Sequence, residues 1–236
     1  MKVHGGPTGS VSTSLDLRLQ FWTSRGFAVL DVNYGGSTGY GREYRRRLDG
    51  LWGVLDVDDC IKGALYLVGQ GKVDREKLAI EGASSGGYLV LCALTFRDVF
   101  KAGVSYYGFG NIEVLAEDFH KFESRYVDRL VGPYPRAKAT YAERSPIHFT
   151  KNLSSPVLMF QGTDDTVVLS DQAEAMASAL REQGASVALV TFEGEGHGFR
   201  RAETIKRCLD AELYFFSKIF GFKAAGELKS IEIENL

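Results

Sequence analysis

The sequence predicts an α/β fold built on a mostly parallel, doubly wound sheet. Short apolar runs rich in β-branched and aromatic residues alternate with longer amphipathic stretches along the 236 residues. This alternation is typical of βαβ units, and the almost continuous apolar character of most runs indicates strands that are covered on both faces. A chain of this length can bury one large core, so a single domain is sufficient.

The elements follow in order along the chain. The predicted strands span residues 27–34, 77–83, 102–107, 156–161 and 187–192. The predicted helices span residues 15–24, 56–68, 87–96, 170–183 and 204–220. Residues 111–152, which are rich in charge and aromatic side chains, break the alternation, and we expect a helical excursion over one end of the sheet. The domain is expected to cover residues 1–223, with 224–236 as a frayed tail or a surface strand.

Composition excludes several classes of function. The formal net charge of −2 gives no reason to expect nucleic acid or an anionic membrane as a partner. The basic cluster at residues 42–47 is interpreted as a solvated helix face. Three scattered cysteines indicate neither a disulfide framework nor a zinc site, and we expect no metal. No run approaches the roughly 18 apolar residues of a membrane span, and we expect no secretion signal, because the first residues lack a charged and then apolar pattern. We therefore expect a cytoplasmic protein, with a homo-oligomer left open.

A nucleophile elbow is indicated at Ser84. The segment from Glu81 to Gly87 reads EGASSGG and lies between an apolar strand and an apolar helix, which is the context that this tight turn demands. Small residues at its glycine positions let neighbouring backbone approach, and the helix N-terminus favours negative charge. The alternative is a glycine-rich connection without catalytic meaning. Ser85 is the rival nucleophile, but it lacks a glycine two residues before it.

A base and an orienting carboxylate must accompany a serine nucleophile, because a hydroxyl is a poor nucleophile until a base takes its proton. His197 lies between two glycines after the last predicted strand, and of the four histidines it alone has this setting. His4, His120 and His148 are the weaker candidates. Asp165 follows the fourth predicted strand, at the sheet edge where such folds bind ligands. Spacing alone does not separate Asp165 from its neighbour Asp164.

An oxyanion-binding loop is indicated by the sequence HGGP at residues 4–7. Loops of this type supply one backbone N–H to the oxyanion in lipases and esterases, and the residue after the nucleophile supplies the other. The predicted donors are Gly6 and Ser85. A glycine turn near the first residue is the simpler alternative.

No cofactor-binding motif is complete in the sequence. Residues 36–41 read GSTGYG and follow a strand, but their spacing is not G-x-G-x-x-G, and no acidic residue follows at the required distance. Neither G-x-x-x-x-G-K-[ST] nor H-E-x-x-H occurs. We therefore expect no cofactor.

Several patches occur in one order along nearly the whole chain. They are HGGP at 4–7, VNYGGSTGYG at 32–41, WG at 52–53, DVDD at 56–59, the elbow at Ser84, ERSPI at 143–147, QGTDDTVV at 161–168 and the loop at 193–200. Together they resemble the catalytic domain of the prolyl oligopeptidase family of serine peptidases, especially its acylaminoacyl-peptidase-like branch. The resemblance implies an α/β-hydrolase fold and assigns the family's acid, in the pattern G-x-x-D-x-x-V, to Asp165.

Two departures from the family are expected to matter. Gly35 stands where the family's turn usually has an arginine. The β-propeller domain that usually accompanies this catalytic domain is not expected here, and the N-terminal strands are expected to be truncated. Only Met1, Lys2 and Val3 can form the interior strand before the HGGP loop. A strand this short would leave backbone groups of its neighbours without partners, each costing about 1–3 kcal/mol if buried.

The resulting functional hypothesis is acyl hydrolysis through an acyl-enzyme. Ser84 attacks, His197 carries the proton, Asp165 orients His197, and the N–H groups of Gly6 and Ser85 bind the oxyanion. By resemblance the substrate is a short peptide. Two alternatives remain: an esterase or lactonase for small molecules with the same residues, and a non-catalytic remnant that keeps the residues without aligning them.

Overall fold

The computed structural model describes residues 1–117 and 125–236. Within them, six strands form one sheet in the order β2-β1-β3-β4-β5-β6, and all neighbouring strands are parallel. Their bounds are Lys2–Val3 for β1, Asp31–Val32 for β2, Ala79–Ala83 for β3, Ala102–Tyr106 for β4, Val157–Gly162 for β5 and Val187–Phe192 for β6. The predicted parallel sheet is therefore observed.

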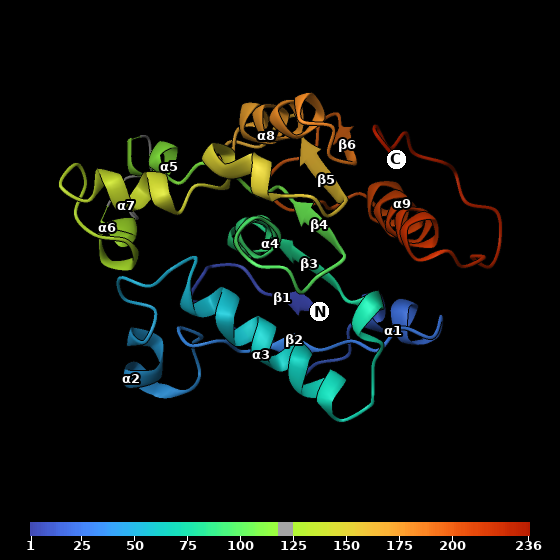
Figure 1. The fold of residues 1–236 in the computed structure, drawn as a ribbon, viewed down its shortest axis with the longest axis horizontal. Helices are drawn as coiled ribbons and strands as arrows, with labels where there is room; N and C mark the ends of the chain where they lie inside the picture. The colour runs from blue at the N-terminus through green and yellow to red at the C-terminus, as the bar shows by residue number, and fades with distance from the viewer. Residues whose placement is uncertain (118–124) are drawn as a thin grey trace.

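Helices cover both faces of the sheet (Figure 1). The longer ones are α1 at Leu17–Thr23, α3 at Leu55–Gly69, α4 at Ser85–Phe96, α8 at Ser170–Glu182 and α9 at Ala202–Phe220. One apolar core contains buried residues of α3, α4 and α8, and a second contains those of α1 and α9. Helix α4 is buried along almost its whole length, because nearly every residue of it is apolar or small. The short helix α2 at Gly41–Arg46 carries the basic cluster and has no buried residue, as a solvated helix should.

The interior strand β1 is short, as expected from the sequence. It pairs with β2 and β3 over only two residues. The predicted strand at 27–34 contributes only Asp31–Val32 to the sheet, because the residues before Asp31 have no neighbouring strand to pair with along most of their length. The predicted strand was therefore too long, because apolar character does not show how much of a segment finds a neighbouring strand.

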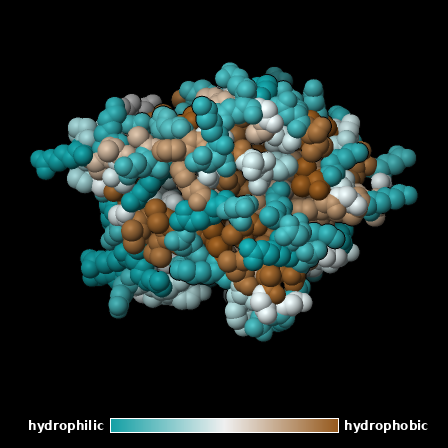
Figure 2. All heavy atoms as spheres, in the orientation of Figure 1, coloured by the Kyte–Doolittle hydropathy of each residue, from teal (hydrophilic) through white to brown (hydrophobic). Residues whose placement is uncertain are grey.

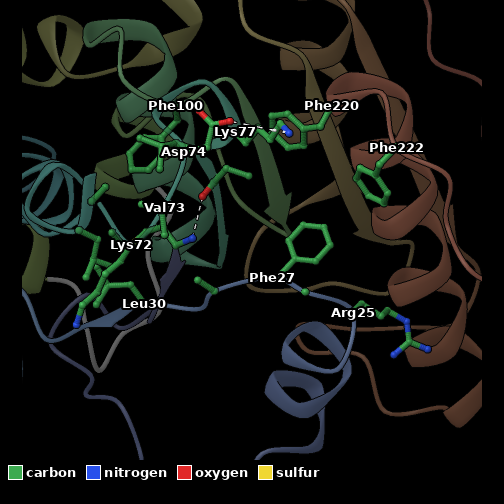
Figure 3. A pocket seen from close by; sticks show the side chains of 17 residues that line it. Arg25, Phe27, Leu30, Lys72, Val73, Asp74, Lys77, Phe100, Phe220 and Phe222 are labelled. Atoms are coloured by element: carbon green, nitrogen blue, oxygen red, sulfur yellow. Dashed lines mark hydrogen bonds and ion pairs between the residues drawn. The ribbon is translucent and has the colours of Figure 1, made fainter. Parts of the chain in front are cut away.

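A cavity of about 460 Å³ lies beside the start of β1 (Figure 3). Its apolar wall includes Phe27, Leu30, Phe100, Phe220 and Phe222, and cationic side chains stand around it. In the space-filling view, hydrophobic residues gather in the lower centre, over α3 (Figure 2). The cavity is at the N-terminal ends of the strands, so it lies on the opposite edge of the sheet from the predicted catalytic residues.

The predicted excursion contains short helices. They are α5 at Glu113–Glu117, α6 at Tyr126–Leu130, α7 at Lys138–Glu143 and a 3₁₀ segment at Pro146–Asn152. His120 lies outside the described residues. In Figure 1 these helices form a group at one end of the sheet, away from α1 and α9.

The C-terminal residues run along the edge of the sheet. The backbone groups of Val187 and Glu234 exchange two hydrogen bonds of 3.1 and 2.9 Å in an antiparallel bridge. The carboxylate of Glu234 also pairs with Arg181, and Ile231 is buried. This segment is a surface element that partly covers the free edge of β6. No helix in the described part of the chain is long and apolar enough to cross a membrane.

Candidate active site

Ser84 lies on the turn between β3 and α4, with φ 57° and ψ −122°. A non-glycine residue rarely adopts such a conformation. Ser84 precedes the first residue of α4. Glycines at positions 82 and 86 make so tight a turn possible. A Cβ on Gly82 would overlap the backbone of Gly86, and a Cβ on Gly86 would lie 2.7 Å from the carbonyl oxygen of Val3. The N–H of Ser84 donates to the carbonyl of Tyr106 on β4 at 2.9 Å, which fixes the elbow to the neighbouring strand.

His197 stands between Ser84 and Asp165. Its Nε2 is 2.9 Å from Ser84 Oγ, and its Nδ1 is 2.8 Å from Asp165 Oδ2. The structure therefore brings together three side chains that are 32 to 113 residues apart in sequence, each at the C-terminal end of its strand. The histidine side chain is 22% exposed and the aspartate side chain is fully buried, so the base faces solvent on one side only.

Asp165 is held as an ionised hydrogen-bond acceptor. Burial by itself would raise the pKa of this carboxyl, but hydrogen bonds from His197 and from the N–H groups of Val168 and Val167 outweigh burial and lower the pKa. The two N–H groups donate to Oδ1 at 2.9 Å each, while Gln161 lies 3.4 Å from Oδ2. Asp164 is exposed, and its side chain accepts from the hydroxyl of Thr163. The geometry therefore distinguishes the two adjacent carboxylates.

The HGGP loop lies against the nucleophile. A Cβ on Gly5 would lie 2.8 Å from the carbonyl oxygen of Ala83 and 3.5 Å from Ser84 Cβ. Ser85 is the first residue of α4, so its N–H has no partner within the helix. The predicted donors Gly6 and Ser85 thus belong to two segments that meet at the elbow around Ser84.

His4 takes a structural place rather than a place beside Ser84. Its ring stacks on Tyr34 at a centroid distance of 4.2 Å, and its Nε2 is 2.8 Å from Ser37 Oγ. The hydroxyl of Tyr34 donates to the carbonyls of His4 and Pro7 at 3.1 and 2.7 Å. These contacts hold the HGGP loop in shape. His148 is also separate from the site, with its Nε2 3.6 Å from a carboxylate oxygen of Glu113.

Glu195 joins the acid loop to the histidine loop, and sequence reasoning missed it. Its carboxylate is buried and accepts from the N–H groups of Arg200 and Arg201, at 3.0 and 3.1 Å, just before α9 begins. Its carbonyl accepts from the N–H of Asp164 at 3.0 Å. Gly162 has no side chain at the point where the loop of Glu195 crosses it. The sequence signal that could have indicated this residue is its position in a glycine-rich loop, two residues before His197.

The described residues show neither a candidate metal cluster nor an exposed thiol. Among residues 1–117 and 125–236, no cluster of three histidine, cysteine or acidic side chains is placed to hold a metal ion. The three cysteines are free and buried.

Comparison with known proteins identifies the family. A model of the prolyl oligopeptidase family matches residues 13–223. The chain belongs to the prolyl oligopeptidase family. This confirms the resemblance found from the sequence patches.

Members of this family with known names are similar over nearly the whole chain. Dipeptidyl aminopeptidase BIII of Pseudoxanthomonas mexicana is 32% identical across 94% of this chain. Among solved structures, a puromycin-hydrolyzing peptidase of Mycobacterium tuberculosis is 50% identical with a TM-score of 0.96 across 99% of this chain. The acylaminoacyl peptidase of Pyrococcus horikoshii is 27% identical with a TM-score of 0.84 across 96% of it. These neighbours confirm the α/β-hydrolase fold class.

The chain spans about a third of the length of these relatives. The shares of the relatives that it covers are 33%, 35% and 38%, in the order given above. The names of the relatives therefore describe proteins about three times as long.

Proposed function

We propose that this domain hydrolyses acyl bonds through an acyl-enzyme on Ser84. His197 Nε2 takes the hydroxyl proton as Ser84 Oγ bonds to the substrate carbonyl carbon, and the negative charge moves to the carbonyl oxygen. The N–H groups of Gly6 and Ser85 bind this oxyanion. His197 then gives the proton to the leaving amine or alcohol. Water, deprotonated by the same histidine, releases the acyl group and restores Ser84.

The observation that carries the proposal is the hydrogen bonding of His197 at both ring nitrogens. An aspartate at Nδ1 favours the tautomer that leaves Nε2 free to accept the proton of Ser84. The distances of 2.8 and 2.9 Å lie within the range that proton transfer requires. A histidine packed for structural reasons alone would have no need of a strained serine at one end and a buried carboxylate at the other.

We propose short peptides and aminoacyl amides as the substrate class. The support is the family and the names of its similar members, which are peptidases and a puromycin hydrolase. Small esters and lactones remain the alternative, because their hydrolysis uses the same residues. A cytoplasmic location is proposed on the free cysteines, and the oligomeric state is left to measurement.

The test is a panel of aminoacyl p-nitroanilides and p-nitrophenyl esters, with Ser84→Ala as the control. Turnover of the nitroanilides that disappears in the variant supports the proposal. Turnover of esters alone would count against peptidase action.

The non-catalytic alternative is a protein that keeps Ser84, Asp165 and His197 without aligning them for reaction. It predicts a folded protein whose Ser84 does not react with a fluorophosphonate. Labelling of the folded protein separates the two hypotheses. Thermal unfolding shows whether an unlabelled protein is folded, so that a lost reaction can be assigned to misalignment rather than to unfolding.

A further inference from the structure

Tyr107 has a backbone conformation that its residue type disfavours. It follows directly after β4 and has φ 37°, in the left-handed region. Its N–H donates to the carbonyl of Phe160 on β5 at 2.7 Å. Strained residues of this kind persist only where the surrounding structure holds them, and they cluster at functional sites. From the sequence, this tyrosine is predicted only to end a strand.

The ring of Tyr107 packs on the histidine loop. Its centroid is 4.9 Å from that of His197, with the two ring planes at 62°, and 5.2 Å from that of Phe199, at 78°. The preceding residue, Tyr106, accepts the N–H of Ser84. The last residue of β4 and the residue after it therefore contact the backbone of the nucleophile and the ring of the base.

The two hydrogen bonds of His197 do not by themselves fix its side chain. Rotation about the Cα–Cβ or Cβ–Cγ bond of His197 would swing Nε2 away from Ser84 Oγ and Nδ1 away from Asp165 Oδ2. Hydrogen bonds weaken steeply with such misalignment. A ring packed at a steep angle against the imidazole opposes this rotation, and aromatic pairs favour this geometry.

We propose that Tyr107 is a positioning residue that holds the His197 imidazole in line with Ser84. The inference rests on the proposed function, since alignment matters only if Ser84 reacts. The positive φ and the contact with His197 occur at the same residue, as expected where the structure holds a strained residue at a functional site. The rival role is that of a wall of the substrate site, which would affect substrate binding and leave the alignment unchanged.

The experiment compares the rate of labelling by diisopropyl fluorophosphate in the wild type, Tyr107→Ala, Tyr107→Phe and Phe149→Ala. The reagent is small, so its rate reports the reactivity of Ser84 rather than the fit of a long substrate. Phe149 forms an edge-to-face pair with Phe96, at 5.4 Å and 66°, and among the described residues it is not one of the hydrogen-bond or ring partners of the proposed triad. It is therefore the matched control for loss of a half-buried ring.

We expect labelling of Tyr107→Ala to be about 10-fold slower or more, and that of the other two variants to stay within about 2-fold of the wild type. With a nitroanilide substrate, the loss should appear in kcat rather than in KM. Wild-type labelling in Tyr107→Ala, with a raised KM, would assign the ring to substrate binding and overturn the proposal. An equal loss in Phe149→Ala would also overturn it. Tyr107→Leu serves if the alanine variant does not fold.

A second measurement does not depend on activity. The proton between His197 Nδ1 and Asp165 gives a low-field NMR resonance, which should be present in the wild type and in Tyr107→Phe and be broadened or lost in Tyr107→Ala. An unchanged resonance in Tyr107→Ala would overturn the inference. If the wild type shows this resonance and takes no label, the proposed function fails, and the resonance of the variant still decides whether Tyr107 positions the ring.

Discussion

Replacing Asp165 with asparagine tests the orienting role at a single atom. Asp165 Oδ1 accepts the N–H groups of Val167 and Val168, so the amide oxygen of an asparagine must take that position. Its NH₂ group then faces His197 Nδ1. Because two donors cannot pair, the imidazole must accept at Nδ1 and carry its proton on Nε2. That tautomer cannot take the proton of Ser84.

The size of the loss follows from this change of tautomer. In serine proteases with the same arrangement, the equivalent substitution leaves the geometry intact and lowers kcat by about 10⁴. This factor corresponds to about 5.4 kcal/mol of transition-state stabilisation. The fold should be little affected, since the shape of the side chain and the two backbone hydrogen bonds are retained.

Asp164→Asn is the matched control, because the same change is made one residue earlier on an exposed carboxylate. We expect its kcat/KM for a nitroanilide to stay within about 2-fold of the wild type. Circular dichroism and thermal unfolding should show that both variants are folded. The reasoning is refuted if Asp165→Asn keeps more than a tenth of wild-type activity, or if Asp164→Asn loses as much as Asp165→Asn.

Two further predictions concern buried carboxyls. Glu195→Ala removes the acceptor of two N–H groups before α9. We therefore expect a loss of roughly 3 kcal/mol in the free energy of unfolding, measured by urea denaturation, and slower labelling of Ser84. Glu195→Gln should lose less, and equal stability of the alanine variant and the wild type would contradict the role of Glu195. Burial raises the pKa of Asp56 to about 7, above its usual 3.8. The folded state therefore keeps a proton there that the unfolded chain has lost, and stability falls as pH rises from 3.8 to 7. Asp56→Asn should be more stable than the wild type at pH 8, by up to about 4 kcal/mol, and this gain should shrink toward pH 4. A gain that does not depend on pH would contradict a raised pKa of Asp56 in the folded protein.

The elbow and the histidine could be predicted from the sequence because each depends on local patterns. An apolar strand, the glycines around Ser84 and an apolar helix specify one turn, and glycines on both sides set His197 apart. Asp165 was chosen over Asp164 by the family pattern, since both follow the same strand. Only the fold shows that one carboxylate is buried against His197 while the other is exposed.

Residues that act through tertiary contacts could not be predicted in the same way. Tyr107 belongs to an apolar run that predicts only a strand, and its contact with His197 joins segments 90 residues apart. The extent of pairing of the segment before Asp31 also depends on its neighbours in the sheet rather than on its own sequence. The short helices between residues 111 and 152 were expected only as an excursion, because charged and aromatic side chains at irregular spacing fix no helical face.

The most direct test of the central claim is site-specific labelling by a fluorophosphonate at neutral pH. The proposed mechanism predicts one label per chain on Ser84, identified by mass spectrometry of the digested protein. It also predicts no label in Ser84→Ala and strongly slowed labelling in His197→Ala, with both variants folded. A label on another residue, or equal labelling of the wild type and His197→Ala, would contradict the claim that His197 activates Ser84.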